Sequence, residues 1–324
     1  MIIAMLPDEK RLHLQHGPID LIIEAFGGQP EIAAAYRAAA ERFETVLDEL
    51  VTELPTLRTP APSFPRRRES REEASDSQRY ALDSRLRGND GIGVIAKKMF
   101  AAVMPHAPDF ITPMAAVAGA VADEILATMT AALSLEKAYV NNGGDIALYL
   151  APHSNQNFQT GIVSNPTTGE LVTTATIASD AGIKGIATSG WNGRSHSLGI
   201  ADSVTVFAKS AAIADAAATI IANHVDVPDC KNITRQPADH LSPDSDLGSR
   251  LVTVSVGSLK PDEITRALAL GEHKAQTLCQ SGLIIAAFIC LQGVAKIVHW
   301  PIDDQPAFVP HSKTAILQDR ISHA

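Results

Sequence analysis

Residues 185–223 decide the fold of this chain, and they read GIATSGWNGRSHSLGIADSVTVFAKSAAIADAAATIIAN. The apolar run VTVF predicts a strand, and the alanine-rich stretch at 211–223 predicts a helix for which Ser210 is a suitable N-cap. Asp215 and Thr219 are four residues apart, so a helix places both on one face. Their oxygen atoms are of the kind that a hard cation or a phosphate-bound metal needs. This stretch therefore predicts a strand, a helix and a candidate metal site.

Apolar periodicity in the rest of the chain predicts strand pairs that alternate with long helices. The expected strands lie within 11–23, 138–150, 159–164, 171–178, 183–188, 251–256 and 283–291. The expected helices lie at 30–54, 92–104, 114–133 and 211–223, and another begins at Pro261. No regular β-α-β rhythm connects these elements. The pattern favours an α+β fold, in which a mostly antiparallel sheet is covered by a layer of helices.

We expect a single domain over 1–294, with two segments that stand apart from it. Residues 63–91 contain seven arginines and six acidic residues but few large apolar ones, so they cannot bury enough surface to order themselves. We expect a solvated, disordered insertion there, without a role in chemistry. Residues 295–324 have no clear period and contain three prolines, and we expect an irregular tail.

Composition excludes several classes of protein. The 324 residues suffice for one large domain or two small ones, and 45% of them are hydrophobic, which is ample for a core. The net charge of −9 argues against nucleic-acid binding, which needs a basic field. Neither a P-loop nor a G-x-G-x-x-G motif after a strand is present, so the common nucleotide folds are not supported.

Cysteine use and hydropathy indicate a cytoplasmic protein. Cys230, Cys279 and Cys290 are scattered without a C-x-x-C pair, so we expect neither a disulfide framework nor a zinc site. The apolar run at 1–6 lacks the length and the basic leader of a signal peptide. The most apolar run, 282–291, is too short to span a bilayer. We therefore expect cytoplasmic localisation and no membrane partner.

Three clusters lie next to expected strand or helix ends, where functional sites gather. They are AGAVAD at 118–123, NGGD at 142–145, and TSGW at 188–191 followed by Asp215 and Thr219. The glycine pair of the second cluster either lets a ligand approach bare backbone or forms a tight hairpin turn. The third cluster either donates hydroxyls and amides to a phosphate or makes an ordinary capped turn. The last two residues either bind Mg²⁺ or are an Asp favoured by the helix dipole and a Thr bonded to its own backbone.

Other polar residues carry weaker signals. Ser189, His196 and Asp202 are the residue types of a hydrolase triad, but no G-x-S-x-G elbow is present, and the sequence does not favour a hydrolase. His106 follows a proline, and we expect a surface histidine at a helix end. The sequence assigns no catalytic residue.

The three clusters, in this order, resemble the ApbE-like family of FAD-dependent flavin transferases, which move FMN from FAD onto a Thr or Ser of a target protein, release AMP and use Mg²⁺. The family's motifs K-G-x-x-x-D, G-G-[DN]-I, S-G-x and V-T-V followed by A-D-A-x-x-T are similar to residues 118–123, 143–146, 189–191, 204–206 and 214–219. Ala118 replaces the lysine of the first motif.

More closely, most of the chain resembles an uncharacterised cytoplasmic family related to ApbE. The segments that carry this resemblance are HGPIDLIIEAFG, FITPMAAVAGAVADEIL, AYVNNGGDIAL, GIATSGW, SLGIADSVTV and PDSDLG. The fold that it implies is a duplicated T-fold, in which an antiparallel sheet is backed by long helices.

The resemblance also implies a ligand and the residues that hold it. The implied cofactors are FAD and Mg²⁺, the implied metal ligands are Asp215 and Thr219, and the implied partner is an acceptor protein. The implied cofactor-binding residues are Gly119, Asp123, Asn142, Gly143, Gly144, Asp145, Thr188, Ser189 and Gly190.

Two departures from the family pattern keep other functions open. Transferases of this type follow S-H with I-I-D-P-x-T-G, whereas Ser195-His196 runs directly into residues 197–199, SLG. The missing loop and the missing lysine favour flavin binding over flavin transfer. Because the T-fold also hosts pterin and purine enzymes, a pterin-like or purine-like ligand is the alternative, on fold analogy. A non-catalytic member with a vestigial site is the third hypothesis.

Overall fold

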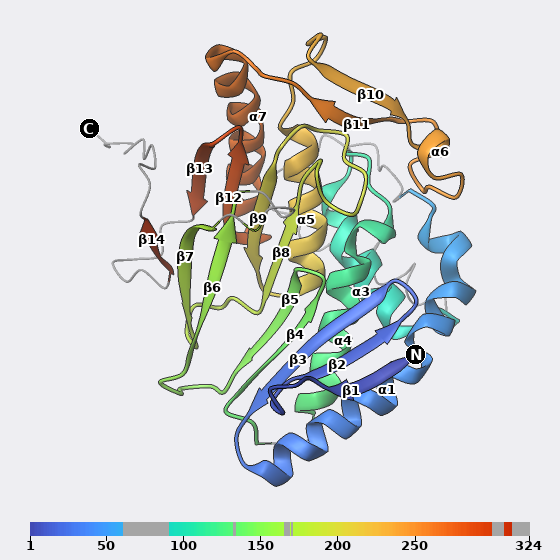
Figure 1. The fold of residues 1–324 in the computed structure, drawn as a ribbon, viewed down its shortest axis with the longest axis vertical. Helices are drawn as coiled ribbons and strands as arrows, with labels where there is room; N and C mark the ends of the chain where they lie inside the picture. The colour runs from blue at the N-terminus through green and yellow to red at the C-terminus, as the bar shows by residue number, and fades with distance from the viewer. Residues whose placement is uncertain (61–90, 132–133, 165–168, 170, 300–307, 313–324) are drawn as a thin grey trace, which may run out of the picture.

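One large antiparallel sheet organises the molecule (Figure 1). The computed structural model describes residues 1–60, 91–131, 134–164, 169, 171–299 and 308–312. The sheet has nine strands, in the order β1 (Ile2–Met5), β2 (Leu12–His16), β3 (Ile19–Phe26), β4 (Lys137–Asn142), β5 (Asp145–Leu150), β8 (Gly185–Ser189), β9 (Ser203–Ala208), β12 (Ile284–Leu291) and β13 (Val294–His299). Every neighbouring pair is antiparallel.

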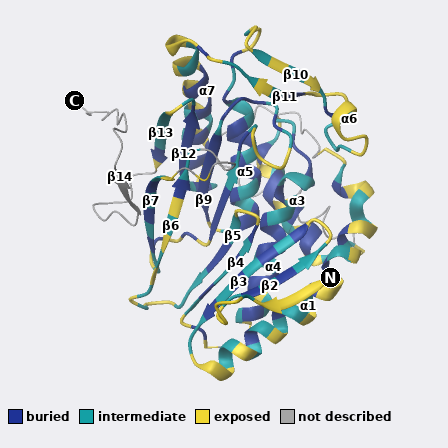
Figure 2. Cartoon of the chain, in the orientation of Figure 1, coloured by how far each residue is buried: buried dark blue, intermediate teal, exposed yellow. Residues whose placement is uncertain are grey.

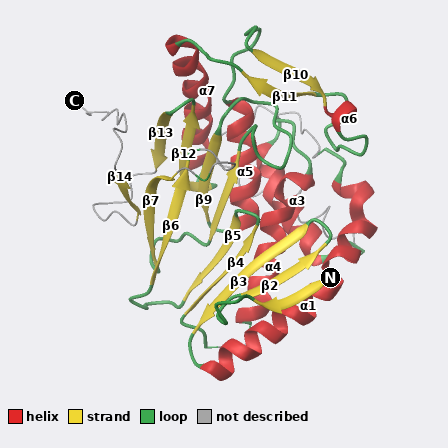
Figure 3. Cartoon of the chain, viewed as in Figure 1, coloured by secondary structure: helices red, strands yellow, loops and turns green. Residues whose placement is uncertain are grey.

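Helices cover one face of this sheet, as Figure 3 shows. They are α1 (Gln29–Leu57), α3 (Val94–Val103), α4 (Val117–Thr130), α5 (Ala211–His224) and α7 (Pro261–Gln280), with the short turns η1 (Met104–His106) and η2 (Pro113–Ala116). Along the sheet, α1 packs on β2 and β3, α4 on β4 and β5, α5 on β8 and β9, and α7 on β12 and β13. This arrangement confirms the expected α+β class with an antiparallel sheet under a layer of helices.

Smaller sheets flank the main one. A second sheet joins β6 (Asn157–Val163), β7 (Leu171–Ala178) and β14 (Phe308–Ser312). A separate hairpin pairs β10 (Ile233–Pro237) with β11 (Leu251–Val256), and the short helix α6 (Ala238–Leu241) lies between them. Ile162, Ile177, Phe207 and Phe288 belong to one buried cluster, so the second sheet covers the face of β9 and β12 that the helices leave open.

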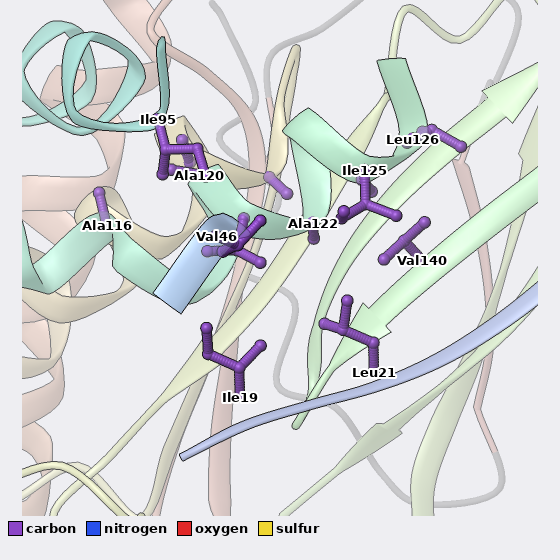
Figure 4. Close-up of a cluster of buried hydrophobic side chains, with 14 of the residues drawn as sticks. Ile19, Leu21, Val46, Ile95, Ala116, Ala120, Ala122, Ile125, Leu126 and Val140 are labelled. Carbon is purple, nitrogen blue, oxygen red and sulfur yellow. The ribbon is translucent and has the colours of Figure 1, made fainter. Parts of the chain in front are cut away.

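Alternating side chains explain why the sheet has a helical side. In β3, Ile19, Leu21, Ile23 and Ala25 are buried, whereas the residues between them are half-buried. A strand directs successive side chains to opposite faces, so one set packs under the helices. Figure 4 shows the labelled members of this core: Ile19 and Leu21 with Val46 of α1, Ile125 of α4 and Val140 of β4. Figure 2 shows the same burial across the whole chain.

The C-terminal expectation was wrong for its first residues. Residues from 295 were expected to be irregular, but Val294–His299 form β13 and pair with β12. The physical reason is the turn before it: Gln292 and Gly293 both have positive φ, at 46° and 78°. Two such residues make the turn that matches the twist of a hairpin. The rest of the tail beyond β13 and β14 lies outside the described residues.

Other boundaries differ in smaller ways. Helix α1 continues through Pro55 to Leu57, because Leu57 is buried on the same helix face as Val46 and Leu50. β1 and β10 were not expected, since their runs are short, whereas β11 coincides with the strand expected at 251–256. The expected disordered insertion at 63–91 lies, except for Gly91, outside the described residues.

Candidate functional site

The site is built where α4 and α5 begin side by side. Both carboxylate oxygens of Asp123 in α4 accept hydrogen bonds from α5, from Ala211 N and Ala212 N at 2.9 Å each. The expected N-cap is confirmed, because Ser210 Oγ accepts from Ile213 N at 3.2 Å. A Cβ on Gly119 would lie 2.3 Å from the Ala211 carbonyl oxygen, so only glycine permits this approach. These contacts hold the first two turns of α4 against the first turn of α5.

Asp215 points from α5 back toward the start of α4. Gly119 N donates to its Oδ2 at 3.0 Å. Burial raises the pKa of Asp215 well above its ordinary value, and the nearby carboxylate of Asp145 raises it further. Hydrogen bonds from the backbone of Gly119 and Ala118 oppose this rise in pKa. Asp215 is half-buried by its exposed surface, and no described residue forms an ion pair with it.

Asp145 is the second acid of the site. It is the first residue of β5, and its Oδ1 accepts from Thr188 N in β8 at 3.3 Å. Burial raises the pKa of Asp145 to about 7, against the opposing effects of the Thr188 N–H and the Arg194 charge. Asp145 and Asp215 together are called the two-carboxylate site below. Two carboxylates that are costly to ionise can be relieved by a proton or by a cation.

Thr219 differs from most of the helical threonines. Thr52, Thr128, Thr265 and Thr277 each donate to the carbonyl oxygen four residues earlier, at 2.8–3.1 Å. The Thr219 hydroxyl forms no hydrogen bond with any described residue, although the residue is half-buried in α5. The alternative that this threonine is bonded to its own backbone is therefore not what the structure shows, and its hydroxyl oxygen can accept a ligand.

The glycine pair of the second cluster forms a tight turn. Gly143 and Gly144 join β4 to β5 with φ values of +64° and +115°. Asn142, just before them, is 4% exposed, and its Nδ2 donates to the Ala118 carbonyl at 3.1 Å. The hairpin-turn alternative thus describes this pair, and the turn places Asp145 beside α4. Asn142 ties the turn to the helix.

The third cluster lies at the end of β8. Thr188 Oγ1 and Thr205 Oγ1 are 2.9 Å apart, and Ser189 ends the strand. A Cβ on Gly190 would lie 2.3 Å from the Asp202 carbonyl oxygen, so the backbone turns tightly here. The structure brings Gly119, Asp145, Thr188 and Asp215 together, as the clusters suggested. The assignment of these residues to a cofactor stays a prediction.

The hydrolase triad does not assemble. His196 Nε2 lies 3.3 Å from Ser242 Oγ rather than beside Ser189. Asp202 accepts from Trp191 Nε1 at 3.1 Å and from the backbone N–H of Gln292. Its carboxylate therefore joins the loop after β8 to the turn before β13, which is a structural task.

The expectation for His106 was wrong. Its side chain is buried, at 2% exposure, and neither ring nitrogen has a hydrogen-bond partner among the described residues. Burial lowers the pKa of His106 to about 4, and the nearby charge of Lys274 lowers it too. The helix does end there, but the charges of Lys274 in α7 and His224 in α5 act on the ring, and no local pattern predicts that segments so far along the chain come near it.

Arg194 is the residue that sequence reasoning missed. Its Nη2 donates to the Gly143 carbonyl at 3.3 Å, and its charge acts on Asp145. It lies in the loop after β8, where no spacing marked it. Within the described chain, no three His, Cys, Asp or Glu side chains gather to hold a metal. A cation here would therefore depend on the two carboxylates and on hydroxyl or backbone oxygens. All three cysteines are free.

Comparisons with known proteins agree with the motifs. A family model described as AbpE bacteria matches residues 3–297. A UPF0280 protein of Methanopyrus kandleri is 36% identical over 142 residues, which are 43% of this chain and 52% of that protein. A UPF0280 protein of Methanocaldococcus jannaschii is 40% identical over 114 residues, covering 35% and 44%. The chain spans about half the length of the curated relatives it matches.

Solved structures are similar at lower identity. The flavin transferase ApbE from Vibrio cholerae is 13% identical, with 90% of this chain and 97% of that chain covered and a TM-score of 0.40. The apo form of Pseudomonas stutzeri flavinyl transferase ApbE is 14% identical, with 94% and 93% covered and a TM-score of 0.42. Among the described residues, every helix is too short or too polar to cross a lipid bilayer.

Proposed function

We propose that this chain, which belongs to the family described as AbpE bacteria, binds FAD together with Mg²⁺ at the two-carboxylate site. The observation that carries this proposal is the pair of acids, Asp145 and Asp215, whose pKa values are both raised by burial. Each lacks a cation in ion-pair contact among the described residues. Ionising two such buried carboxylates lowers the stability of the fold, and a bound cation would offset this loss.

The donors fit Mg²⁺. This ion takes oxygen ligands and is usually held by one or two carboxylates, with phosphate oxygens of the substrate completing its shell. Asp145 and Asp215 supply carboxylates, and Thr219 supplies a hydroxyl that no described residue engages. When bound, the ion would neutralise the charge of a diphosphate. Both carboxylate oxygens of Asp123 accept hydrogen bonds from amides of α5, so we propose that this residue holds α4 and α5 together rather than binding the ligand.

Binding is the primary proposal, because the missing loop and lysine favour it; the activity that we propose beyond binding is transfer of FMN from FAD to the hydroxyl of an acceptor protein. The acceptor oxygen would form a new bond to the FMN phosphorus and lose its proton, the bond from that phosphorus to the bridging oxygen would break, and AMP would leave with the bridging oxygen and that proton. Electrostatic stabilisation and positioning supply most of the catalysis in phosphoryl transfers of this kind. The duplicated T-fold and the cytoplasmic location belong to the same proposal, and the free cysteines support the latter.

A binding titration tests the proposal. Metal-stripped protein is titrated with FAD, with and without Mg²⁺, and quenching of flavin fluorescence is followed. We expect Mg²⁺-dependent binding, and we expect Asp215→Asn and Thr219→Val to lose most of that dependence. Asp180→Asn is the matched control, because Asp180 is exposed. Binding that ignores Mg²⁺, or an Asp215→Asn protein that behaves as the wild type, would contradict the assignment. Stabilisation by a pterin but not by FAD would favour the alternative ligand.

A further inference from the structure

A side chain at Gly143 would displace the guanidinium of Arg194 from its position. The guanidinium lies against the turn between β4 and β5, where a Cβ on Gly143 would be 1.5 Å from Nη2 and 2.6 Å from Cζ. The φ of +64° at Gly143 also favours glycine. The neighbouring Gly144 has nothing within 4 Å of its own Cβ position. The space beside Gly144 is therefore open, whereas the space beside Gly143 is occupied by the guanidinium of Arg194.

The guanidinium has unused hydrogen-bonding capacity. Arg42 is ion-paired with Glu49 at 2.8 Å and with Glu124 at 3.0 Å, so its charge is neutralised within the fold. Arg194 forms no ion pair with a described residue, and its hydrogen bond to the Gly143 carbonyl uses one of five N–H donors. The residue is exposed, so the other donors can reach a ligand.

The position next to the two-carboxylate site gives this cation a task. Arg194 is close enough to Asp145 for its charge to act on that carboxylate. An anionic ligand that approaches Asp145 and Asp215 meets like charge, which repels it. A fixed guanidinium beside the acids offsets this repulsion, and its planar fork matches two oxygens of a phosphate.

We propose that Arg194 is the phosphate-binding residue of the site and makes it select ligands that carry a phosphate or diphosphate. The inference rests on the proposed function, because it supposes that the ligand sits at the two-carboxylate site. Gly143 then leaves space for the guanidinium, and its carbonyl oxygen accepts a hydrogen bond from it.

Substitutions at position 194 test the proposal with two probes, FAD and magnesium pyrophosphate, each titrated by calorimetry. We expect Arg194→Ala to weaken binding of both by about tenfold or more, as for a lost hydrogen bond to a charged group. Arg194→Lys keeps the charge but not the fork, and we expect it to recover part of the loss. Arg266→Ala is the matched control, because Arg266 is also exposed and pairs only with Asp262 at 3.8 Å.

The turn supplies an independent test. We expect Gly143→Ala to weaken the binding of both probes as much as Arg194→Ala does, because the new methyl group displaces the guanidinium. Gly144→Ala strains the same turn without touching Arg194, and we expect it to bind both probes as the wild type does.

The outcomes separate the two proposals. If Arg194→Ala binds the probes as tightly as the wild type, the role of Arg194 is refuted and the flavin function stands. If the wild type binds pyrophosphate but not FAD, and Arg194→Ala loses pyrophosphate, the anion site stands and the flavin function fails. If the wild type binds FAD but not pyrophosphate, the role of Arg194 is decided by whether Arg194→Ala binds FAD more weakly than the wild type. If the wild type binds neither probe, both proposals fail.

Discussion

At the scale of single residues, two acids on neighbouring helices do different work. Both carboxylate oxygens of Asp123 accept hydrogen bonds from backbone amides of α5. Asp215 accepts a hydrogen bond from Gly119 N, and its charge is repelled by a second nearby acid. The first arrangement stabilises the fold and the second costs free energy unless a ligand relieves it. Function and stability are therefore opposed at Asp215.

The cost at Asp215 predicts a stabilised variant. A folded-state pKa above the unfolded value means that the folded protein disfavours the ionised acid, so stability is lost as pH rises and the loss is present at pH 7. Asp215→Asn removes the charge and keeps an acceptor for Gly119 N. In EDTA we expect its melting temperature to exceed that of the wild type by about 2 °C or more. Mg²⁺ should then raise the melting temperature of the wild type only. A variant that melts lower in EDTA would contradict this account.

His106 predicts an acid-sensitive fold. Its pKa falls from 6.5 to about 4 on folding, so the unfolded chain binds the proton more tightly. The linked stability is complete above pH 6.5 and is lost as pH falls toward 4, by up to about 3 kcal/mol. We expect urea unfolding of His106→Leu to lose less stability than the wild type between pH 7 and pH 5. His240→Leu, at an exposed histidine, should follow the wild type. Parallel curves for all three proteins would show that His106 does not titrate as described.

At the scale of elements, Asp123 predicts how α5 is anchored. Asp123→Ala removes two hydrogen bonds to the first turn of α5, which acts as an N-cap from a second helix. The expected loss is about 1–2 kcal/mol in the free energy of unfolding, measured in urea. Asp180→Ala should change that free energy by less than about 0.5 kcal/mol, since Asp180 is exposed. Equal effects of the two substitutions would rule out the anchoring role.

Local elements were predictable because their signals are local. The spacing of Asp215 and Thr219 and the cap at Ser210 follow from the helix, and the structure confirms that helix and cap. The meeting of Asp145 with Asp215 depends on how β5 and α5 pack, which no spacing encodes. Motif resemblance proposed both residues, but only the fold shows that they lie close enough for their charges to interact.

Two of the misses, His106 and Arg194, have the same physical origin, which is contact between segments far apart in the chain. The surroundings of His106 include Lys274 and His224, which lie much further along the chain. The position of Arg194 depends on a contact between two loops that are 51 residues apart. The strand β13 was missed for a different reason, because its turn carries Gln292 rather than the Asn or Asp that marks such hairpins.

At the scale of the whole molecule, the site lies where two cores meet. Ala211, Ala212 and Ala216 of α5 belong to the core under α1, α3 and α4, whereas Ala214 and Ala217 belong to the core under α7. Helix α5 is thus shared by both halves of the sheet. The two-carboxylate site takes Asp145 from one half and Asp215 from this shared helix, so its geometry depends on the register between the halves.

The insertion at 63–91 predicts the last outcome, because the two ends of the segment that contains it are held close together. Helix α1 ends at Leu57, α3 begins at Val94, and Glu53 Oε1 accepts a hydrogen bond from Gly93 N. A linker of about eight glycine and serine residues is long enough to join such ends. Shortening a flexible loop lowers its closure entropy only slightly, so we expect the melting temperature to stay within about 2 °C.

Replacement of 63–91 by this linker should also leave the Mg²⁺ response unchanged, since the hydrogen bonds that the described residues make to Asp145 and Asp215 come from Thr188 and from the backbone at 118–119, outside the segment. The measurement is thermal unfolding with and without Mg²⁺, and the control is the full chain under the same conditions. A large fall in melting temperature would mean that the segment packs on the domain. A lost Mg²⁺ response at unchanged melting temperature would mean that it reaches the site, and either result would overturn its interpretation as an insertion without a role in chemistry.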